Sequence, residues 1–229
     1  MQRDLLLASP KEQSLGFRYT IFAVLFLPSV LSLGCTALGI ELHDLGLNLL
    51  YFSVNLLAIA VIFRRFLAAS FQEFDEKWVR IVVVFVLGFA AYYGTNLLLG
   101  MLIAHFFPDF GNANDGGIAA LARENYTLTA ISTVLLVPIA EECMHRGAIF
   151  GGIYRKNRPL AYVISTIIFA LVHIDGFFGM VDGKILLLNF LQYVPAGVLL
   201  AAAYDISGSI FAPVFIHMTV NLLGILLLR

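Results

Sequence analysis

Long apolar runs dominate this chain and limit what it can fold into. A helix needs about 20 mostly apolar residues to cross the hydrocarbon core of a bilayer. Runs of this kind occur at about 17–40, 45–68, 78–106, 126–150, 159–175, 184–204 and 209–228. They predict an all-α fold, a polytopic transmembrane bundle of about seven to eight helices that forms one integral membrane domain over residues 1–229.

Composition and charge exclude most soluble classes of protein. Hydrophobic residues make up 60% of the chain and charged residues 13%, whereas ordinary globular proteins have about 45–50% and about 25%. The 14 basic residues are balanced by 15 acidic ones, so there is no basic surface for a nucleic-acid partner. The lipid bilayer is the expected partner of most of the surface. The sequence does not indicate an oligomeric state.

The basic residues predict the orientation of the bundle, because cytoplasmic loops carry an excess of Lys and Arg. An N-terminus in the cytoplasm leaves only Arg123, Lys184 and Arg229 on the outer side. The basic residues then on the cytoplasmic side are Arg3, Lys11, Arg18, Arg64, Arg65, Lys77, Arg80, Arg155, Lys156 and Arg158. We therefore expect an integral protein of the bacterial plasma membrane with a cytoplasmic N-terminus.

A few polar residues lie inside the apolar runs, where a charged side chain costs about 2.5–3.5 kcal/mol on insertion scales. They are Glu141, Glu142, His145, Arg146, His173, His217 and Asn221. Such residues normally face the interior of a bundle or a water-filled cavity. These residues belong to the runs at 126–150, 159–175 and 209–228. Counted at the rise per residue of a helix, they lie at overlapping depth in the cytoplasmic-to-central part of the bilayer. The pattern predicts a buried polar cavity.

Helix geometry separates the two adjacent glutamates. Glu142 and Arg146 are four residues apart, with the acid first, which favours an ion pair within one helix. Glu141 then has no partner unless His145 takes it. A carboxylate held in a partly dry cavity without a partner is a candidate general base. His217 and Asn221 are also four apart, so their side chains project from one face.

Three motifs in this half of the chain resemble a known family. They are Glu141-Glu142-Cys143-Met144-His145-Arg146, Phe169-Ala170-Leu171-Val172-His173 and His217-Met218-Thr219-Val220-Asn221. In this order they resemble the CPBP family of intramembrane proteases, which includes the type II CAAX prenyl endopeptidases and bacteriocin-processing or immunity proteins of bacteria. The resemblance covers about residues 125–225, the expected catalytic core. Family members usually carry an aromatic residue where this chain has His145.

The resemblance implies an intramembrane endopeptidase whose glutamate activates a water near the cytoplasmic side of the membrane. By this resemblance Glu141 and His173 activate the water, and His217 and Asn221 stabilise the oxyanion. The residues expected to support these four are Glu142, Arg146, His145 and Phe169. The implied substrate is a peptide or a membrane protein, and no cofactor is expected.

Three alternatives stay open on the sequence alone. Glu141, His173 and His217 would offer three ligands to a zinc ion with an open water position, although no His-Glu-x-x-His motif is present. A non-catalytic immunity or regulatory protein of the same fold would bind a partner instead of cleaving it. A proton-coupled transporter would use a buried glutamate as a relay.

Asn189 and Gln192 either line the cavity or join helices to one another.

Overall fold

The computed structural model describes residues 5–228, and within them the regular structure is helical, without strands. Arg3 and Arg229, two of the basic residues from which the orientation is predicted, lie outside the described residues. The first half consists of α1 (Pro10–Leu25), α2 (Leu27–Ala37), α3 (Asp44–Ile62), α4 (Arg64–Gln72), α5 (Phe74–Phe106) and α6 (Ala113–Glu124).

The second half begins with one continuous helical stretch that changes its winding several times. It consists of α7 (Tyr126–Ile131), a π-helix (Ser132–Leu136), α8 (Val137–Glu142), a second π-helix (Cys143–Phe150) and α9 (Gly151–Tyr154). After it come α10 (Arg158–Val172), a 3₁₀ turn (Asp175–Phe177), α11 (Gly183–Ser207) and α12 (Phe211–Leu227).

The predicted polytopic membrane bundle is confirmed. Four apolar stretches among the described residues are long enough to cross a bilayer: Asp44–Ile62, Phe74–Phe106, Tyr126–Tyr154 and Gly183–Ser207. The pair α1 and α2 is long and apolar enough when taken together but is bent by 59°, and α10 and α12 are shorter apolar helices. These segments coincide with the seven predicted runs. The separate helices outnumber the predicted seven to eight for two reasons. The runs at 17–40 and 126–150 are each divided into several helices, and the short helices α4 and α6 connect longer ones.

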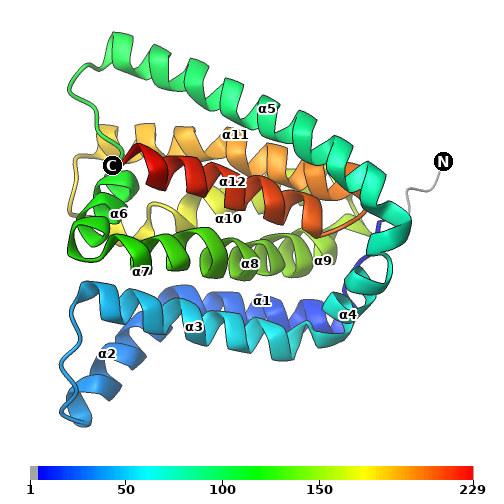
Figure 1. The fold of residues 1–229 in the computed structure, drawn as a ribbon, viewed down its shortest axis with the longest axis horizontal. Helices are drawn as coiled ribbons and strands as arrows, with labels where there is room; N and C mark the ends of the chain where they lie inside the picture. The colour runs from blue at the N-terminus through cyan, green and yellow to red at the C-terminus, as the bar shows by residue number, and fades with distance from the viewer. Residues whose placement is uncertain (1–4, 229) are drawn as a thin grey trace.

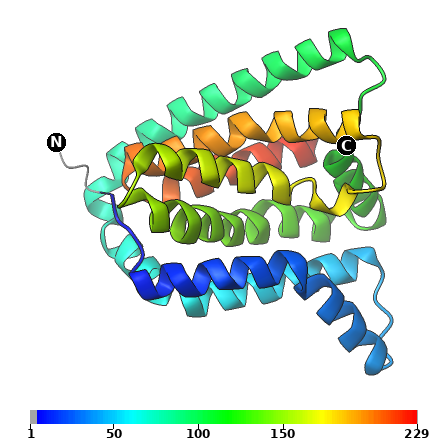
Figure 2. The ribbon, with the colours of Figure 1, turned by 180° about the vertical axis from the view of Figure 1, so that it is seen from behind.

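The helices run side by side between two ends of the bundle (Figure 1). The stretch α7–α9 and helices α10, α11 and α12 form its centre, with α1 and α3 on one side and α5 on the other (Figures 1 and 2). We call the end that holds α4 and the α9–α10 and α11–α12 connections the basic end. The opposite end, which holds α6 and the α2–α3 and α10–α11 connections, is called the acidic end.

Short polar residues start the helices that carry the site. The side chains of Asn125 and Asn157 accept backbone N–H groups in the first turns of α7 and α10, and Asp182 does the same for α11. These contacts satisfy donors that a helix start leaves without a partner. Gly208, with a φ of 73°, ends α11 in the left-handed conformation that glycine adopts without strain.

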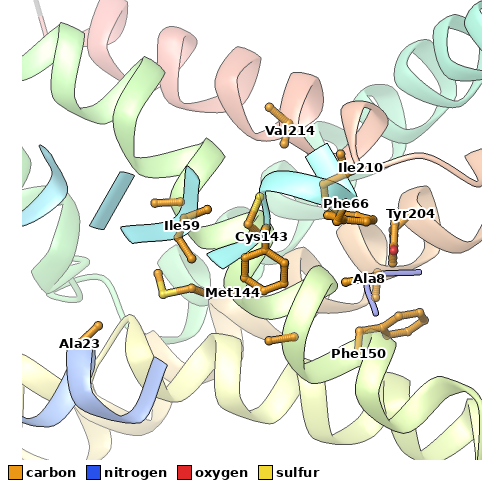
Figure 3. Close-up of a cluster of buried hydrophobic side chains, with 14 of the residues drawn as sticks. Ala8, Ala23, Ile59, Phe66, Cys143, Met144, Phe150, Tyr204, Ile210 and Val214 are labelled. Atoms are coloured by element: carbon orange, nitrogen blue, oxygen red, sulfur yellow. The ribbon is translucent and has the colours of Figure 1, made fainter. Parts of the chain in front are cut away.

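An apolar core closes the basic half of the bundle. Five large side chains are almost completely buried there: Phe63, Phe66, Phe150, Tyr204 and Ile210. They come from the residue between α3 and α4, from α4, the second π-helix and α11, and from the α11–α12 connection. Figure 3 shows four of these side chains among other members of the cluster, including Cys143 and Met144. Side chains packed at the density of an organic crystal leave no channel for water.

The first described residues are fixed to this core. The Tyr204 hydroxyl donates a hydrogen bond to the Leu6 carbonyl, and the Leu6 N–H donates to the Gly208 carbonyl at 3.3 Å. Farther along, the Glu12 carboxylate accepts the backbone N–H groups of Arg65 and Phe66 at 3.2 and 3.0 Å. The N-terminal segment is thereby joined to both halves of the chain.

Candidate active site

One cavity of about 790 Å³ contains the candidate site. The four residues for which a catalytic role is predicted, Glu141, His173, His217 and Asn221, all line it. They come from α8, the residue that follows α10, and α12. The structure thus brings together side chains that three separate motifs contribute.

The two adjacent glutamates have different surroundings. Glu142 is fully buried, and its Oε2 lies 3.1 Å from Nε of Arg146, whose side chain is equally buried. Glu141 lies on the cavity wall, and its Oε2 is buried without a hydrogen-bond partner among the described residues. This oxygen is 3.7 Å from Nε2 of His173 and 4.0 Å from Nε2 of His217. Glu142 therefore compensates the charge of Arg146, whereas Glu141 has a carboxylate oxygen on the cavity wall without a hydrogen-bond partner in the described chain.

His217 is held by the glutamate that is paired with arginine. Its Nδ1 lies 3.0 Å from Oε1 of Glu142, and an ionised carboxylate only accepts hydrogen bonds. The Nδ1 atom of His217 therefore carries the proton, and Nε2 faces the cavity. Because Glu142 contacts both Arg146 and His217, its negative charge lies between two groups able to carry a positive one.

His173 has a fixed tautomer as well. Its Nδ1 donates to the Phe169 carbonyl at 2.8 Å, which leaves Nε2 as the acceptor on the side of Glu141. Tyr193 stacks on the His173 ring with centroids 4.3 Å apart, and the Phe169 ring lies 4.4 Å from it. Two aromatic rings and one hydrogen bond thus fix the direction of Nε2.

Phe169 supports more than one site residue. Its ring is 5.1 Å from the His145 ring and 6.1 Å from the His217 ring, and the Arg146 guanidinium lies over it at 4.9 Å. Such aromatic and cation–π contacts stabilise the geometry of the groups around the ring. The position predicted as support for His173 therefore contacts all three histidines of the site.

Asn221 is oriented by the first π-helix. Its Nδ2 donates to the Thr133 carbonyl at 2.8 Å. A side-chain amide carries two N–H donors, so one of them remains for a group in the cavity. His217 and Asn221 share one face of α12, as their spacing of four residues predicts.

His145 does not pair with the Glu141 carboxylate. Its Nδ1 instead donates to the Glu141 backbone carbonyl at 2.8 Å, and its Nε2 is buried without a hydrogen-bond partner among the described residues. The residue belongs to the second π-helix, whose wider winding differs from the α-helix that sequence spacing assumes. Short π-helical segments occur frequently at functional sites.

The outer part of the cavity is polar and was not predicted as a whole. Asn112 donates to Gln192 Oε1 at 2.6 Å, and the Ala113 N–H donates to Asn189 Oδ1 at 3.0 Å. Asn189 therefore joins α11 to α6, whereas Gln192 both lines the cavity and joins the two helices. Three residues that belong to no motif contact the site or line its cavity in the folded chain: Tyr193, Asn112 and Thr133.

Two carboxyl groups lie on the cavity wall near the acidic end. Asp115 belongs to α6 and Asp175 to the turn after α10. Desolvation raises the pKa of both above the usual value for aspartate, and the nearby His173 opposes the shift. The site is therefore bordered by acidic groups on the side away from the apolar core.

Three of the site residues are the ligands of the zinc alternative, which stays a prediction. Within residues 5–228, no group of three or more His, Cys, Asp or Glu side chains is placed to hold a metal. Glu141, His173 and His217 approach one another but do not form such a group.

Comparison with known proteins agrees with the three motifs. Residues 123–223 match the family model of Rce1-like type II CAAX prenyl endopeptidases. The matched segment begins just before α7 and ends within α12, so it contains every residue of the candidate site that was predicted. The predicted resemblance is confirmed for this part of the chain.

Two curated relatives extend the similarity toward the N-terminus. The chain is 28% identical over 137 residues to "Putative membrane peptidase YdiL" of Bacillus subtilis, covering 54% of this chain and 52% of the relative. It is 26% identical over 162 residues to "UPF0177 protein YxdF" of Lactococcus lactis, covering 69% and 82%. The match thus spans about half the length of the first relative. No solved structure matches.

Proposed function

We propose that this chain is an intramembrane endopeptidase that hydrolyses a peptide bond with a water activated by Glu141. The observation that carries the proposal is the buried Oε2 of Glu141, which has no hydrogen-bond partner in the described chain and lies 3.7 and 4.0 Å from two imidazole nitrogens. The match to a family of prenyl endopeptidases supports the same class of reaction.

In the proposed reaction, a water binds between Glu141 Oε2 and His173 Nε2. A gap of 3.7 Å between the two acceptors lets one water donate a hydrogen bond to each of them. Glu141 takes a proton from the water as the oxygen attacks the peptide carbonyl. His173, held by the Phe169 carbonyl and Tyr193, orients the water, and the proton then passes to the leaving amine.

The oxyanion is stabilised from α12. Asn221 contributes its second amide N–H, while His217 donates from Nε2 when its ring carries two protons. The Glu142 carboxylate, 3.0 Å from Nδ1, holds the ring so that Nε2 points into the cavity. Loss of one oxyanion donor costs about 2.7–4 kcal/mol of transition-state stabilisation in enzymes where it has been measured.

The proposed substrate is a peptide or a membrane protein, and the proposed membrane is the bacterial plasma membrane with the N-terminus in the cytoplasm. Glu141 lies about 20 Å along the helix from Tyr154 and about 22 Å from Tyr126. Hydrolysis is therefore proposed within the membrane, in the cytoplasmic-to-central part of the bilayer.

Substitution of the base tests the proposal. Peptides and protein fragments in membranes that contain the active chain are compared with those from membranes that contain Glu141→Gln at the same level. Glu76→Gln, an exposed position at the start of α5, is the matched control. We expect products that appear with the parent chain and the control and disappear with Glu141→Gln. Equal cleavage by all three would rule out Glu141 as the base.

A chelator separates the glutamate mechanism from the zinc alternative. Incubation of the purified protein with 1,10-phenanthroline should leave cleavage unchanged if Glu141 acts without a metal. Loss of cleavage that zinc restores would instead assign Glu141, His173 and His217 as ligands.

A further inference from the structure

The two ends of the bundle differ sharply in charge. The basic residues of the acidic end are Arg123 and Lys184, both in the described chain. Those at or toward the basic end are Lys11, Arg18, Arg64, Arg65, Lys77, Arg80, Arg155, Lys156 and Arg158. Because Lys and Arg are retained in cytoplasmic loops, this distribution places the basic end in the cytoplasm and the acidic end on the other side of the membrane.

The catalytic cavity extends toward only one of these ends. Its wall includes Asn114 and Asp115 of α6, Asp175 after α10 and Leu228 after α12, all at the acidic end. Toward the basic end, the packed core around Phe63 closes the bundle, and the buried aromatic residues of that core do not line the cavity. The cavity therefore leads from Glu141 toward the acidic end, and the apolar core closes the bundle on the other side.

Helix α6 covers this route. It buries none of its residues, yet Asn112, Asn114, Asp115, Ile118 and Leu121 line the cavity. Its N-terminal end contacts α11 through hydrogen bonds of Asn112 and Ala113 with Gln192, Asn189 and Tyr193. A helix held by a few side-chain hydrogen bonds and no buried apolar side chain opens at a low free-energy cost.

We propose that the substrate reaches Glu141 from the extracytoplasmic side, beneath α6, which opens as a cover when its contacts with α11 break. The substrate is then a segment whose cleaved bond is reachable from the outer face of the membrane. This inference rests on the proposed function for its chemistry, but the route itself is measurable without any cleavage.

A cysteine inside the cavity reports the route. Val220 lies on the cavity wall between His217 and Asn221. Val220→Cys is made in a chain whose own cysteines are replaced, Cys35→Ser and Cys143→Ala. A membrane-impermeant maleimide is added to right-side-out and to inside-out membrane vesicles. Lys156→Cys, exposed at the basic end, is the orientation control, and Leu223→Cys is a second reporter on the same wall.

We expect Val220→Cys to be labelled at least about tenfold faster in right-side-out vesicles, and Lys156→Cys to be labelled only in inside-out vesicles. Labelling of both cysteines from the same side would overturn the proposed route. Failure of both cavity reporters to label from either side would overturn it too, because no route would then exist.

The cover is tested by weakening its attachment. Gln192→Ala removes the acceptor of Asn112, and the loss of one hydrogen bond is expected to raise the labelling rate of Val220→Cys about fivefold. Gln72→Ala, an exposed glutamine at the end of α4, should leave the rate unchanged. An equal rate in Gln192→Ala would rule out α6 as the cover. Neither rate depends on Glu141, so this test can fail independently of the proposed reaction.

Discussion

The adjacent glutamates offer a matched test, because the same chemical change at each is expected to have opposite effects. Glu142→Gln removes the charge that compensates Arg146, and both side chains of this pair are fully buried. Removing one partner of a buried pair costs about 3–5 kcal/mol, since the remaining charge stays buried without compensation. That cost lowers the ratio of folded to unfolded protein by about two to three and a half orders of magnitude. Glu141→Gln removes no comparable partner, so it should abolish cleavage while leaving stability close to that of the parent chain.

Cys143 supplies the assay, because its side chain is 1% exposed and becomes reactive only when the core opens. A thiol-reactive dye is added to detergent-solubilised protein carrying Cys35→Ser, and its fluorescence is followed during heating and in a denaturant series. We expect a large loss of stability for Glu142→Gln and almost none for Glu141→Gln. Equal stability of the two variants would refute the assignment of charge compensation to Glu142.

Three further substitutions test other contacts. Asn221→Ala should lower kcat by about 10²–10³ with little change in KM, because it removes one oxyanion donor; steady-state kinetics on an identified substrate checks this. Gly197→Ala should destabilise the protein by about 1–3 kcal/mol, because the new Cβ would lie 3.0 Å from the Thr166 backbone. Gly100→Ala, in open surroundings, should not destabilise it, and thermal unfolding compares the two variants. Asp205→Asn should cost about 1–3 kcal/mol in the same measurement, because this buried carboxylate accepts hydrogen bonds from two tyrosines and an arginine.

Much of the architecture could be predicted because bilayer thickness imposes a length on every span. The seven apolar runs correspond to the helical segments of the bundle, and the spacing of Glu142 and Arg146 correctly indicated their ion pair. The bend between α1 and α2 was not predicted, although Pro28 in the first turn of α2 lacks the N–H that would continue the hydrogen bonds of α1. Hydropathy alone contains no information on such a bend.

The residues of the site that belong to the three motifs could be predicted from the sequence. Glu141, His173, His217 and Asn221 stand out because polar groups are costly in lipid, and the fold places them around one cavity. The surroundings of His145 were not predictable, because the π-helix changes which residues share a face. Tyr193 and Thr133 could not be singled out either, since a tyrosine stacked on histidine and a backbone acceptor resemble any other helix residue in sequence.

The attachment of Leu6 to Tyr204 and Gly208 has a consequence for biosynthesis. The hydrogen-bonded residues Leu6 and Tyr204 are 198 positions apart, so the ribosome releases the N-terminal segment long before its partners have been made. During most of translation the backbone groups of Leu6 are left to water and lipid headgroups. The bundle is completed only when the last helical hairpin has been inserted, and a nascent chain that stops before that hairpin presents an unattached N-terminal segment to the quality-control proteases of the cell.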